Sequence, residues 1–404
     1  MKTLLIVGAG LEAVPGIELA KSMGLHIVVS DINPNAPGFR VADDSLLAST
    51  YDVPATVAAA RTYHNQVRAL DGVMCIACDV PMAVASVAAA LELPGISIES
   101  ARLATDKLAM KERFASDAVP IPWFSPVKSA KELCELVRKQ GLPLVIKPVD
   151  SRGSRGVLRL TPSVDLKWAY ELARSHSPSG RVMLEGFLPG PQISTESIVI
   201  DGQVYTPGFA DRNYEYLDHY APHIIENGGQ LPTRLDMTTQ RAVHDLVQHA
   251  ATSMGIREGV VKGDIVVTDG RPHVIEVAAR LSGGYFCTHE IPLSTGVNLV
   301  GAAIRQALGE RVDPKELTPK WNRPVAQRYL FPSPGVVKAI EGAELFANHP
   351  NVAYLEIRAK TGDRIGPVDS HPARAGVVIT TGETEDSAVS MAKDVINSIK
   401  VLIE

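Results

Sequence analysis

The sequence predicts an α/β protein that opens with a doubly wound parallel sheet and ends with a small α+β domain. Three observations predict this class. Strand and helix patterns alternate through the first hundred residues, a second α/β region with hairpin signals spans 130–300, and the tail is rich in strands before a final helix. The chain has 404 residues, 45% of them hydrophobic, which is enough for two or three domain cores.

The N-terminal domain is predicted from its order of elements. Strands are expected at 4–7, 26–31 and 72–77, and helices at 14–23, 55–69 and 81–91. Because strands and helices alternate, the strands are expected to pair in parallel.

Two proline-containing segments mark boundaries further along the chain. A helix predicted at 105–117, capped by Thr105 or Asp106, precedes the proline-rich stretch 119–126, and TPKWNRP (318–324) precedes the tail. The tail has predicted strands near 325–331, 352–358 and 376–380 and a helix at 384–400. We therefore expect domains at 1–104, 105–317 and 318–404, with the middle one divided into subdomains 105–180 and 181–317.

Composition excludes several classes of protein. A formal net charge of −5 gives no basic surface for nucleic acid. No apolar run is long enough to cross a membrane, and MKTLLIV is too short for a signal-peptide core. These features predict a soluble, cytoplasmic protein.

Cys75 and Cys78 form a CxxC pair that could serve metal binding or redox chemistry. They lie in GVMCIACD, which has the pattern of a buried strand, and no second pair completes a zinc site. Structural packing is the favoured interpretation.

A glycine turn after the first strand raises the possibility of a dinucleotide site. Gly8-x-Gly10-x-x-Ala13 fits the permissive fingerprint, and Asp31 ends the second strand, where a ribose-binding acid would lie. The signal is weak, because any tight strand-to-helix turn favours glycine. An NAD-dependent oxidoreductase is thus an alternative to be weighed against the rest of the chain.

Residues 142–157, LPLVIKPVDSRGSRGV, carry features typical of phosphate binding. An apolar strand leads to Lys147, and the loop that follows holds glycines, serines and arginines whose N–H groups can surround phosphate oxygens. Lys107 lies in the first turn of the helix in TDKLAMKERF, against the helix dipole, which a nearby phosphate would explain. The alternative without a ligand is a solvated basic loop and a surface lysine.

The stretch VMLEGFLPG (182–190) reads as a strand that runs into a bend. Glu185 and the backbone near Leu188 could hydrogen-bond an adenine edge. An exposed acid at a strand end is the alternative.

Two strands, 260–270 and 273–280, carry the acids. Residues alternate between faces along a strand, so Glu276, Ala278 and Arg280 face the same way. A three-residue loop, 268–270, would place Asp264 on the same face as Glu276, close enough to share magnesium, whereas a two-residue turn would not. The metal hypothesis therefore predicts the three-residue loop. Arg280 could bind a phosphoryl or carboxyl oxygen in bidentate fashion.

In this order the motifs resemble the ATP-grasp enzymes over nearly the whole chain. The resemblance implies an ATP-grasp fold with an N-terminal Rossmann-like domain that binds no dinucleotide, a central ATP-grasp domain and a C-terminal α+β lid. It implies that ATP contacts Lys107, Lys147, Ser151, Gly153, Ser154, Glu185, Leu188 and Gln192. It further implies Mg²⁺, with Mn²⁺ as an alternative, on Asp264 and Glu276, and a catalytic role for Arg280 together with Lys147.

Two positions depart from the superfamily pattern. Ala278 stands where an asparagine commonly binds the second magnesium, and Gln192 replaces the usual ribose-binding acid. Water can fill a magnesium ligand position, and an amide can still bond a ribose hydroxyl. Within the superfamily, YAPHIIENGGQLP (220–232) and the tail 362–388 most resemble the L-amino-acid ligases.

The implied activity is ATP-dependent formation of an amide or peptide bond through an acyl phosphate, with release of ADP and phosphate. The expected partners are small carboxylate and amine substrates, with amino acids as the expected class, and a homodimer is the default assembly. Substrate contacts are expected from His223, Glu226, Arg280, Gly283 and Gly284, the glycines leaving space beyond Arg280, with His371 and Arg374 as further candidates. The alternatives are a purine-biosynthesis-type enzyme acting on a phosphoribosyl substrate and a non-catalytic ATP-binding protein.

Overall fold

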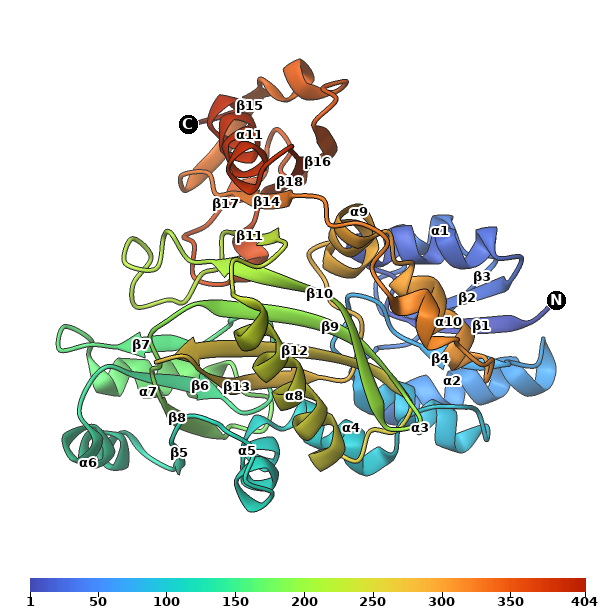
Figure 1. The fold of residues 1–404 in the computed structure, drawn as a ribbon, viewed down its shortest axis with the longest axis horizontal. Helices are drawn as coiled ribbons and strands as arrows, with labels where there is room; N and C mark the ends of the chain where they lie inside the picture. The colour runs from blue at the N-terminus through green and yellow to red at the C-terminus, as the bar shows by residue number, and fades with distance from the viewer.

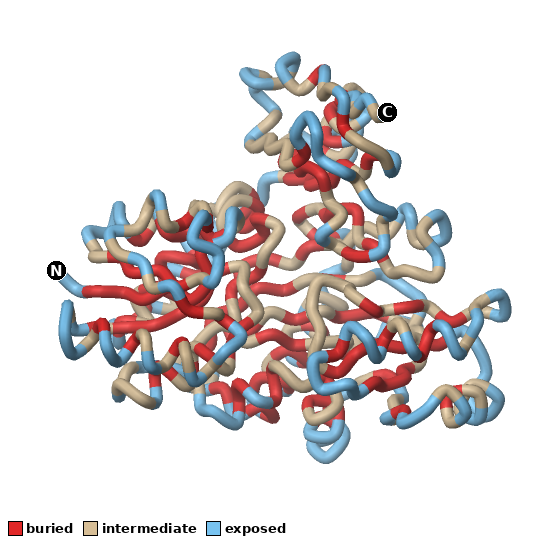
Figure 2. Tube along the Cα trace, turned by 180° about the vertical axis from the view of Figure 1, so that it is seen from behind, coloured by how far each residue is buried: buried red, intermediate tan, exposed pale blue.

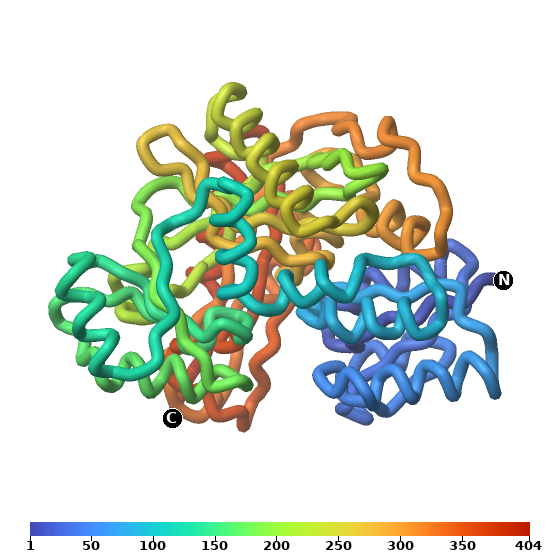
Figure 3. Tube along the Cα trace, turned by 90° about the horizontal axis from the view of Figure 1, so that it is seen from below, coloured from blue at the N-terminus to red at the C-terminus, as the bar shows by residue number.

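A computed structural model describes all 404 residues as α/β layers built on three main sheets and one small one. The N-terminal part lies at one side, the central strands run across the molecule, and the C-terminal part stands above them (Figure 1). The view from below places residues 130–180 and the N-terminal sheet at opposite ends (Figure 3). No helix combines the length and the apolar composition that crossing a membrane requires.

The first sheet is parallel, as the sequence predicted, with strand order β3-β2-β1-β4. Its strands are β1 (Thr3–Val7), β2 (His26–Asp31), β3 (Asp44–Leu47) and β4 (Gly72–Met74). The helices of this part are α1 (Val14–Ser22), α2 (Val53–Gln66), α3 (Pro81–Ala90) and α4 (Ile98–Thr105). Strand β3 and helix α4 were not predicted.

The glycine turn after β1 is closed by the protein's own groups. Asp31 accepts a hydrogen bond from the backbone N–H of Ala9 (3.1 Å), so its carboxylate shapes the turn. Gly8 has φ +101°, and a Cβ there would lie 2.8 Å from Cys78, so the Cys78 side chain covers the turn. Both cysteines of the CxxC pair are free thiols, Cys75 buried and Cys78 partly so. These contacts give Gly8, Asp31 and Cys78 structural roles.

A four-stranded antiparallel sheet, β5-β8-β6-β7, forms the next layer. Its elements are α5 (Lys107–Ser116), β5 (Phe124–Val127), α6 (Ala130–Gln140), β6 (Leu144–Pro148), β7 (Leu158–Leu160), α7 (Leu166–Ser175) and β8 (Val182–Gly186). Asp106 caps α5 by accepting from the N–H groups of Leu108 and Ala109. The first turn of α5, which carries Lys107, is thereby fixed.

The large sheet has the order β13-β12-β9-β10-β11-β14-β18-β16. The central elements are β9 (Gln192–Ile200), β10 (Gln203–Asn213), β11 (Gly228–Leu231), α8 (Met237–Ser253), β12 (Gly259–Thr268), β13 (Arg271–Ala278), α9 (Ile291–Thr295) and α10 (Leu299–Ala307). The C-terminal elements are β14 (Val325–Leu330), β15 (Gly335–Glu341), β16 (Val352–Ile357), β17 (Arg364–Ile365), β18 (Gly376–Thr381), α11 (Glu385–Ser398) and β19 (Lys400–Ile403). Strand β14 pairs with β11, so one sheet continues across residue 318, and the domain boundary there stays a prediction.

The loop between β12 and β13 differs from the prediction. Thr268 pairs with Arg271, so the turn is the two residues Asp269 and Gly270, both with positive φ (50° and 72°). Such a turn alone would place Asp264 opposite Ile275. A β-bulge shifts the register, so that Asp264 pairs with Glu276 instead. The predicted three-residue loop is wrong, but the bulge produces the same juxtaposition.

Burial is concentrated in the sheets and on the inward faces of their helices (Figure 2). The largest apolar cluster joins β1 and α1 of the N-terminal part to α10, with Leu4, Ile17 and Ile304 fully buried within it. The segment 291–307 thus packs against the N-terminal sheet, although it follows the central strands in the chain. This packing fixes the N-terminal part against the large sheet.

Gly190, between β8 and β9, tests how closely the bend after β8 is packed. Its φ is +128°, and an added Cβ would overlap the carbonyl oxygen of Val267. Gly190→Ala should lower the thermal unfolding midpoint by several degrees more than Gly202→Ala, whose φ of +82° is also positive but whose surroundings are open. The control carries only the conformational cost of about 1–2 kcal/mol. Equal midpoints in calorimetry would show that the bend is loosely packed.

Candidate functional site

The three parts of the chain meet around one cavity of about 580 Å³. Almost every residue predicted for the site lines it. These are Lys107, Lys147, Ser151, Gly153, Ser154, Glu185, Leu188, Gln192, Glu226, Asp264, Glu276, Arg280, Gly283, Gly284, His371 and Arg374. Ala278 also lines it, in keeping with the alternation of faces along β13.

His223 is the exception. It bridges to Leu158 of β7, and its ring packs edge-on against Trp168 of α7, with the ring centroids 6.4 Å apart. The loop therefore directs His223 toward α7, whereas Ile224 and Glu226 line the cavity. His223 does not lie with the other predicted substrate residues.

Lys107 connects the loop after β6 (150–157, the phosphate-type loop) to the acidic strands β12 and β13. Its ammonium donates to the Ser151 carbonyl (2.8 Å) and lies 3.0 Å from Glu276. Burial disfavours its charge, but Glu276 and then Asp79 outweigh that effect and raise its pKa. Lys107 thus remains a cation at the position where the sequence predicts phosphate oxygens.

Glu185 is a buried counterion rather than an exposed acid. Its carboxylate, 2% exposed as a residue, lies 2.6 Å from Lys147 and 3.2 Å from Lys111. Burial alone would raise its pKa, but the two lysines lower it. One oxygen is thus paired with Lys147, whereas the other is buried without a hydrogen bond, and the contact of Glu185 and the Leu188 backbone with an adenine edge stays a prediction.

Lys111 was not predicted from the sequence. It is fully buried, donates to the Val274 carbonyl (2.8 Å), and has its pKa lowered to about 8 because burial outweighs Glu185. A lysine four residues after Lys107 on one helix face was the available signal.

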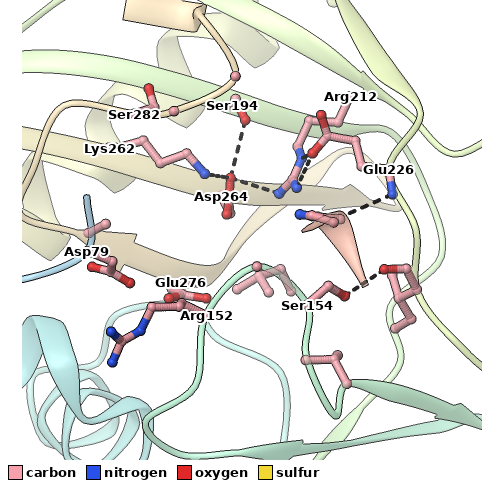
Figure 4. A pocket seen from close by; sticks show the side chains of 18 of the residues that line it. Asp79, Arg152, Ser154, Ser194, Arg212, Glu226, Lys262, Asp264, Glu276 and Ser282 are labelled. Atoms are coloured by element: carbon pink, nitrogen blue, oxygen red, sulfur yellow. Dashed lines mark hydrogen bonds and ion pairs between the residues drawn. The ribbon is translucent and has the colours of Figure 1, made fainter. Parts of the chain in front are cut away.

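Asp264 lies between Lys262 and Arg212, with an ion pair to each and a further contact to Ser194 (3.2 Å) (Figure 4). Burial would raise its pKa, but Arg212 and Lys262 hold it well below the usual range. Asp264 is therefore an anion at any physiological pH.

Two facing carboxylates fit a magnesium ion that is held together with nucleotide phosphates. Asp264 and Glu276 are paired across the bulge, and no third acid, histidine or cysteine joins them. Mg²⁺ is typically bound by one or two carboxylates plus substrate phosphates and water. Both acids are now neutralised by cations of the chain, which the metal and the phosphates would displace.

Arg280 is held near the N-terminal part of the molecule. A parallel bridge between Ile76 and Leu281 brings the end of β4 to this segment, so Asp79 lies 3.6 Å from Arg280. At that distance the Nε of Arg280 and an oxygen of Asp79 are buried without a hydrogen bond. Arg280 therefore lines the cavity with Asp79 as its nearest acid but without a hydrogen bond between them.

Glu196 lies near Arg280, whose charge acts on it. It is fully buried on β9 and accepts from the Ser282 N–H (3.1 Å). Burial raises its pKa to about 8, although Arg280 and the Ser282 hydrogen bond work in the other direction.

The space beside the two glycines is smaller than predicted. A Cβ at Gly283 would lie 2.6 Å from a Glu12 oxygen, and one at Gly284 would overlap the Tyr329 hydroxyl. The glycines thus let Glu12 and Tyr329 approach the backbone, which corrects the expectation that they leave open room for a bulky carboxylate substrate.

The C-terminal segment covers the phosphate-type loop. The N–H of His371 donates to the Gly153 carbonyl (3.0 Å), and Arg374 donates to the Glu226 carbonyl (2.9 Å) while stacking on Tyr329. Burial, and after it Arg374 and Arg212, lowers the pKa of His371 well below its usual value. His371 is therefore neutral in this closed arrangement.

Sequence reasoning missed several charged residues of the cavity. Asp79 had a readable signal, because it follows a strand of a parallel sheet, where functional side chains gather. Lys262 shares a face with Asp264 at a spacing of two residues. Arg212 and Arg358 had no local signal, because they reach the site through strand pairing across the large sheet.

Two family models match the chain. An ATP-grasp domain matches residues 104–284, and the L-amino acid ligase C-terminal domain 2 matches residues 328–404. Among curated proteins, y4rH of Sinorhizobium fredii is 26% identical over 95% of this chain and 79% of its own length. A formate-dependent phosphoribosylglycinamide formyltransferase of Psychromonas ingrahamii is 25% identical over 99% of this chain and 96% of its own.

A D-alanine–D-alanine ligase of Gloeobacter violaceus is 28% identical over 45% of the chain, and that alignment spans 61% of the ligase. The fold is shared with the L-amino acid ligase of Bacillus licheniformis, with a TM-score of 0.83 at 22% identity over 100% of this chain and 99% of that one. Residues 104–284 thus form an ATP-grasp domain and residues 328–404 match the L-amino acid ligase C-terminal domain, which confirms the resemblance of the motifs to ATP-grasp carboxylate–amine ligases.

A substitution at Glu185 tests whether its buried charge stabilises the protein. Glu185→Gln leaves Lys111 and Lys147 without their counterion and should destabilise the protein by about 3–5 kcal/mol, as breaking a buried pair does. Glu215→Gln is the control, because Glu215 pairs with Lys393 at the surface and the change should cost under about 1 kcal/mol. Equal shifts of the two variants in chemical denaturation would contradict a buried, charged Glu185.

Proposed function

We propose that this ligase joins the carboxylate of an amino acid to an amine through an acyl phosphate, with conversion of ATP to ADP and phosphate. The supporting observation is that Lys107, Lys147 and Arg280 line one cavity with the facing acids Asp264 and Glu276. Phosphoryl transfer depends mainly on positioning and on neutralising charge, and this arrangement supplies both.

In the first step, a carboxylate oxygen attacks the γ-phosphorus of ATP, the bond to the bridging oxygen breaks, and ADP leaves. The phosphate-type loop, Lys107 and Lys147 bind the phosphates. Lys107, now 3.0 Å from Glu276, would exchange that carboxylate for a phosphate oxygen. Magnesium held by Asp264 and Glu276 would neutralise the remaining charge.

In the second step, the amine attacks the acyl carbon, loses a proton, and displaces phosphate. Arg280 lines the cavity beside the facing acids and serves to stabilise the tetrahedral oxyanion and the departing phosphate. The contacts of His371 and Arg374 keep the lid over the loop, which excludes water that would hydrolyse the acyl phosphate.

A phosphoribosyl substrate is the second candidate, and the full-length similarity to the phosphoribosylglycinamide formyltransferase favours it. Binding a sugar phosphate needs uncompensated arginines. Arg212 is already paired with Asp264 and Glu226, and Arg358 with Glu12 and Glu356. Arg152 and Arg155 line the cavity without an ion pair, however, so the substrate requirement in turnover decides between the two candidates.

The principal test is phosphate release from ATP and Mg²⁺ with pairs of L-amino acids. Release should require both substrates and should fall more than about 100-fold in Glu276→Ala, since even the outer partners of metal ligands contribute 10- to 100-fold. Glu383→Ala, at an exposed position without partners, is the control and should retain full activity.

The substrate requirement separates the candidates. Release that depends on a phosphoribosyl amine or carboxylate, and not on amino acids, would replace the proposed function with the second one. ATP binding without release under any combination would contradict both.

The lid predicts a specific defect in coupling. Arg374→Ala removes the contacts to Glu226 and Tyr329, so water should reach the acyl phosphate, and phosphate released per amide bond formed should rise several-fold above one. Arg364→Ala, an exposed arginine on β17, is the matched control. A ratio that stays at one in Arg374→Ala would show that these contacts do not exclude water.

A further inference from the structure

One carboxylate on the cavity wall has no partner in the protein. Glu290 is 3% exposed and makes no hydrogen bond or ion pair through its side chain. It ends the π-helical turn Phe286–Glu290, which follows the two glycines, and it precedes α9. The other carboxylates that line the cavity all have a donor or a cation within reach: Glu12, Asp79, Glu185, Asp211, Glu226, Asp264 and Glu276.

The nearest charges do not compensate Glu290. Arg328 gives its hydrogen bonds to the carbonyls of Gly229 and Gln327, and Glu226 adds repulsion. Burial, followed by Glu226, raises the pKa of Glu290 to about 8, while Arg328 works in the other direction. An unpaired buried acid destabilises a fold, and leucine, which is of similar size and apolar, would avoid that penalty. Folding therefore gives no reason for a carboxylate here, whereas a cationic ligand in the cavity would.

Glu290 is one of the residues that line the cavity. Small residues, Ala210 of β10 and Gly229 of β11, line the same cavity as Glu290 and Phe286. An ammonium group placed there would restore the missing ion pair and would be bound through a charge-assisted hydrogen bond.

We propose that Glu290 binds the ammonium group of an amino-acid substrate of this ligase. The inference rests on the proposed function and deepens it, because it assigns a residue to a substrate group. It also accounts for a buried acid without a partner, at a position that neither the phosphate-type loop nor the facing acids use.

The test measures binding without turnover. Wild type and Glu290→Gln are titrated with each L-amino acid and with its N-acetyl derivative, in the presence of a non-hydrolysable ATP analogue and Mg²⁺. Wild type should bind free amino acids and discriminate against the N-acetyl forms, which lack the ammonium charge. Glu290→Gln should bind the free amino acids about 10- to 100-fold more weakly, the usual worth of a hydrogen bond to a charged group.

Two controls separate binding from folding. Glu290→Asp keeps the charge and should retain part of the affinity, and Glu316→Gln changes an exposed acid paired with Arg305 and should retain all of it. Affinity for the ATP analogue should be unchanged in every variant. Weakening for all amino acids would indicate the α-ammonium group, and weakening for lysine and ornithine alone would indicate a side-chain ammonium.

Failure of the inference and failure of the proposed function give different results. If wild type binds amino acids and Glu290→Gln binds them equally well, the inference is overturned and the ligase assignment stands. If wild type binds the ATP analogue but no amino acid, the amino-acid assignment is wrong, and the proposed role of Glu290 is then wrong as well.

Discussion

The buried carboxylate of Glu185, held between Lys111 and Lys147, is the constraint on which the rest of the site depends. It joins α5, β6 and β8, and the bond from Lys111 to the Val274 carbonyl extends the connection to β13 of the large sheet. Lys107 lies one turn before Lys111 on the same helix face. Fixing Lys111 therefore aims Lys107 at both Ser151 and Glu276, and one ion cluster aligns the phosphate-type loop with the acidic strands.

Charge compensation across the cavity explains how so many ionised groups can lie together before any substrate arrives. Arg212 forms ion pairs with both Asp264 and Glu226, and Lys107 forms one with Glu276. Each of these cations is also suited to bind an anionic oxygen. Binding of nucleotide and metal is thus an exchange of partners, which avoids leaving a buried charge unpaired at any stage.

Local pattern was sufficient for much of the fold and for the order of the motifs. Strands β1, β2, β14 and β18 and helices α1, α3 and α11 lie within a few residues of their predicted bounds, because apolar periodicity and turn residues are properties of short segments. The bulge between β12 and β13 was not predictable, since register depends on packing across the sheet. His223 was misplaced for the same reason: a loop's polar residues are visible in sequence, but the direction each one faces is set by distant elements such as α7.

The site exists only where all three parts of the chain meet. Arg358 of the C-terminal part pairs with Glu12 of the N-terminal part at 2.7 Å, and Glu12 also accepts from the N–H of Gly284 (2.6 Å) in the central part. Asp79 contacts Arg280 across another such junction. Surface pairs of this kind are individually weak, but here they are partly buried and close a cavity whose chemistry needs water excluded. The ion pairs that join the three parts also line the cavity, so their strength bears both on the stability of this arrangement and on the room left for substrates.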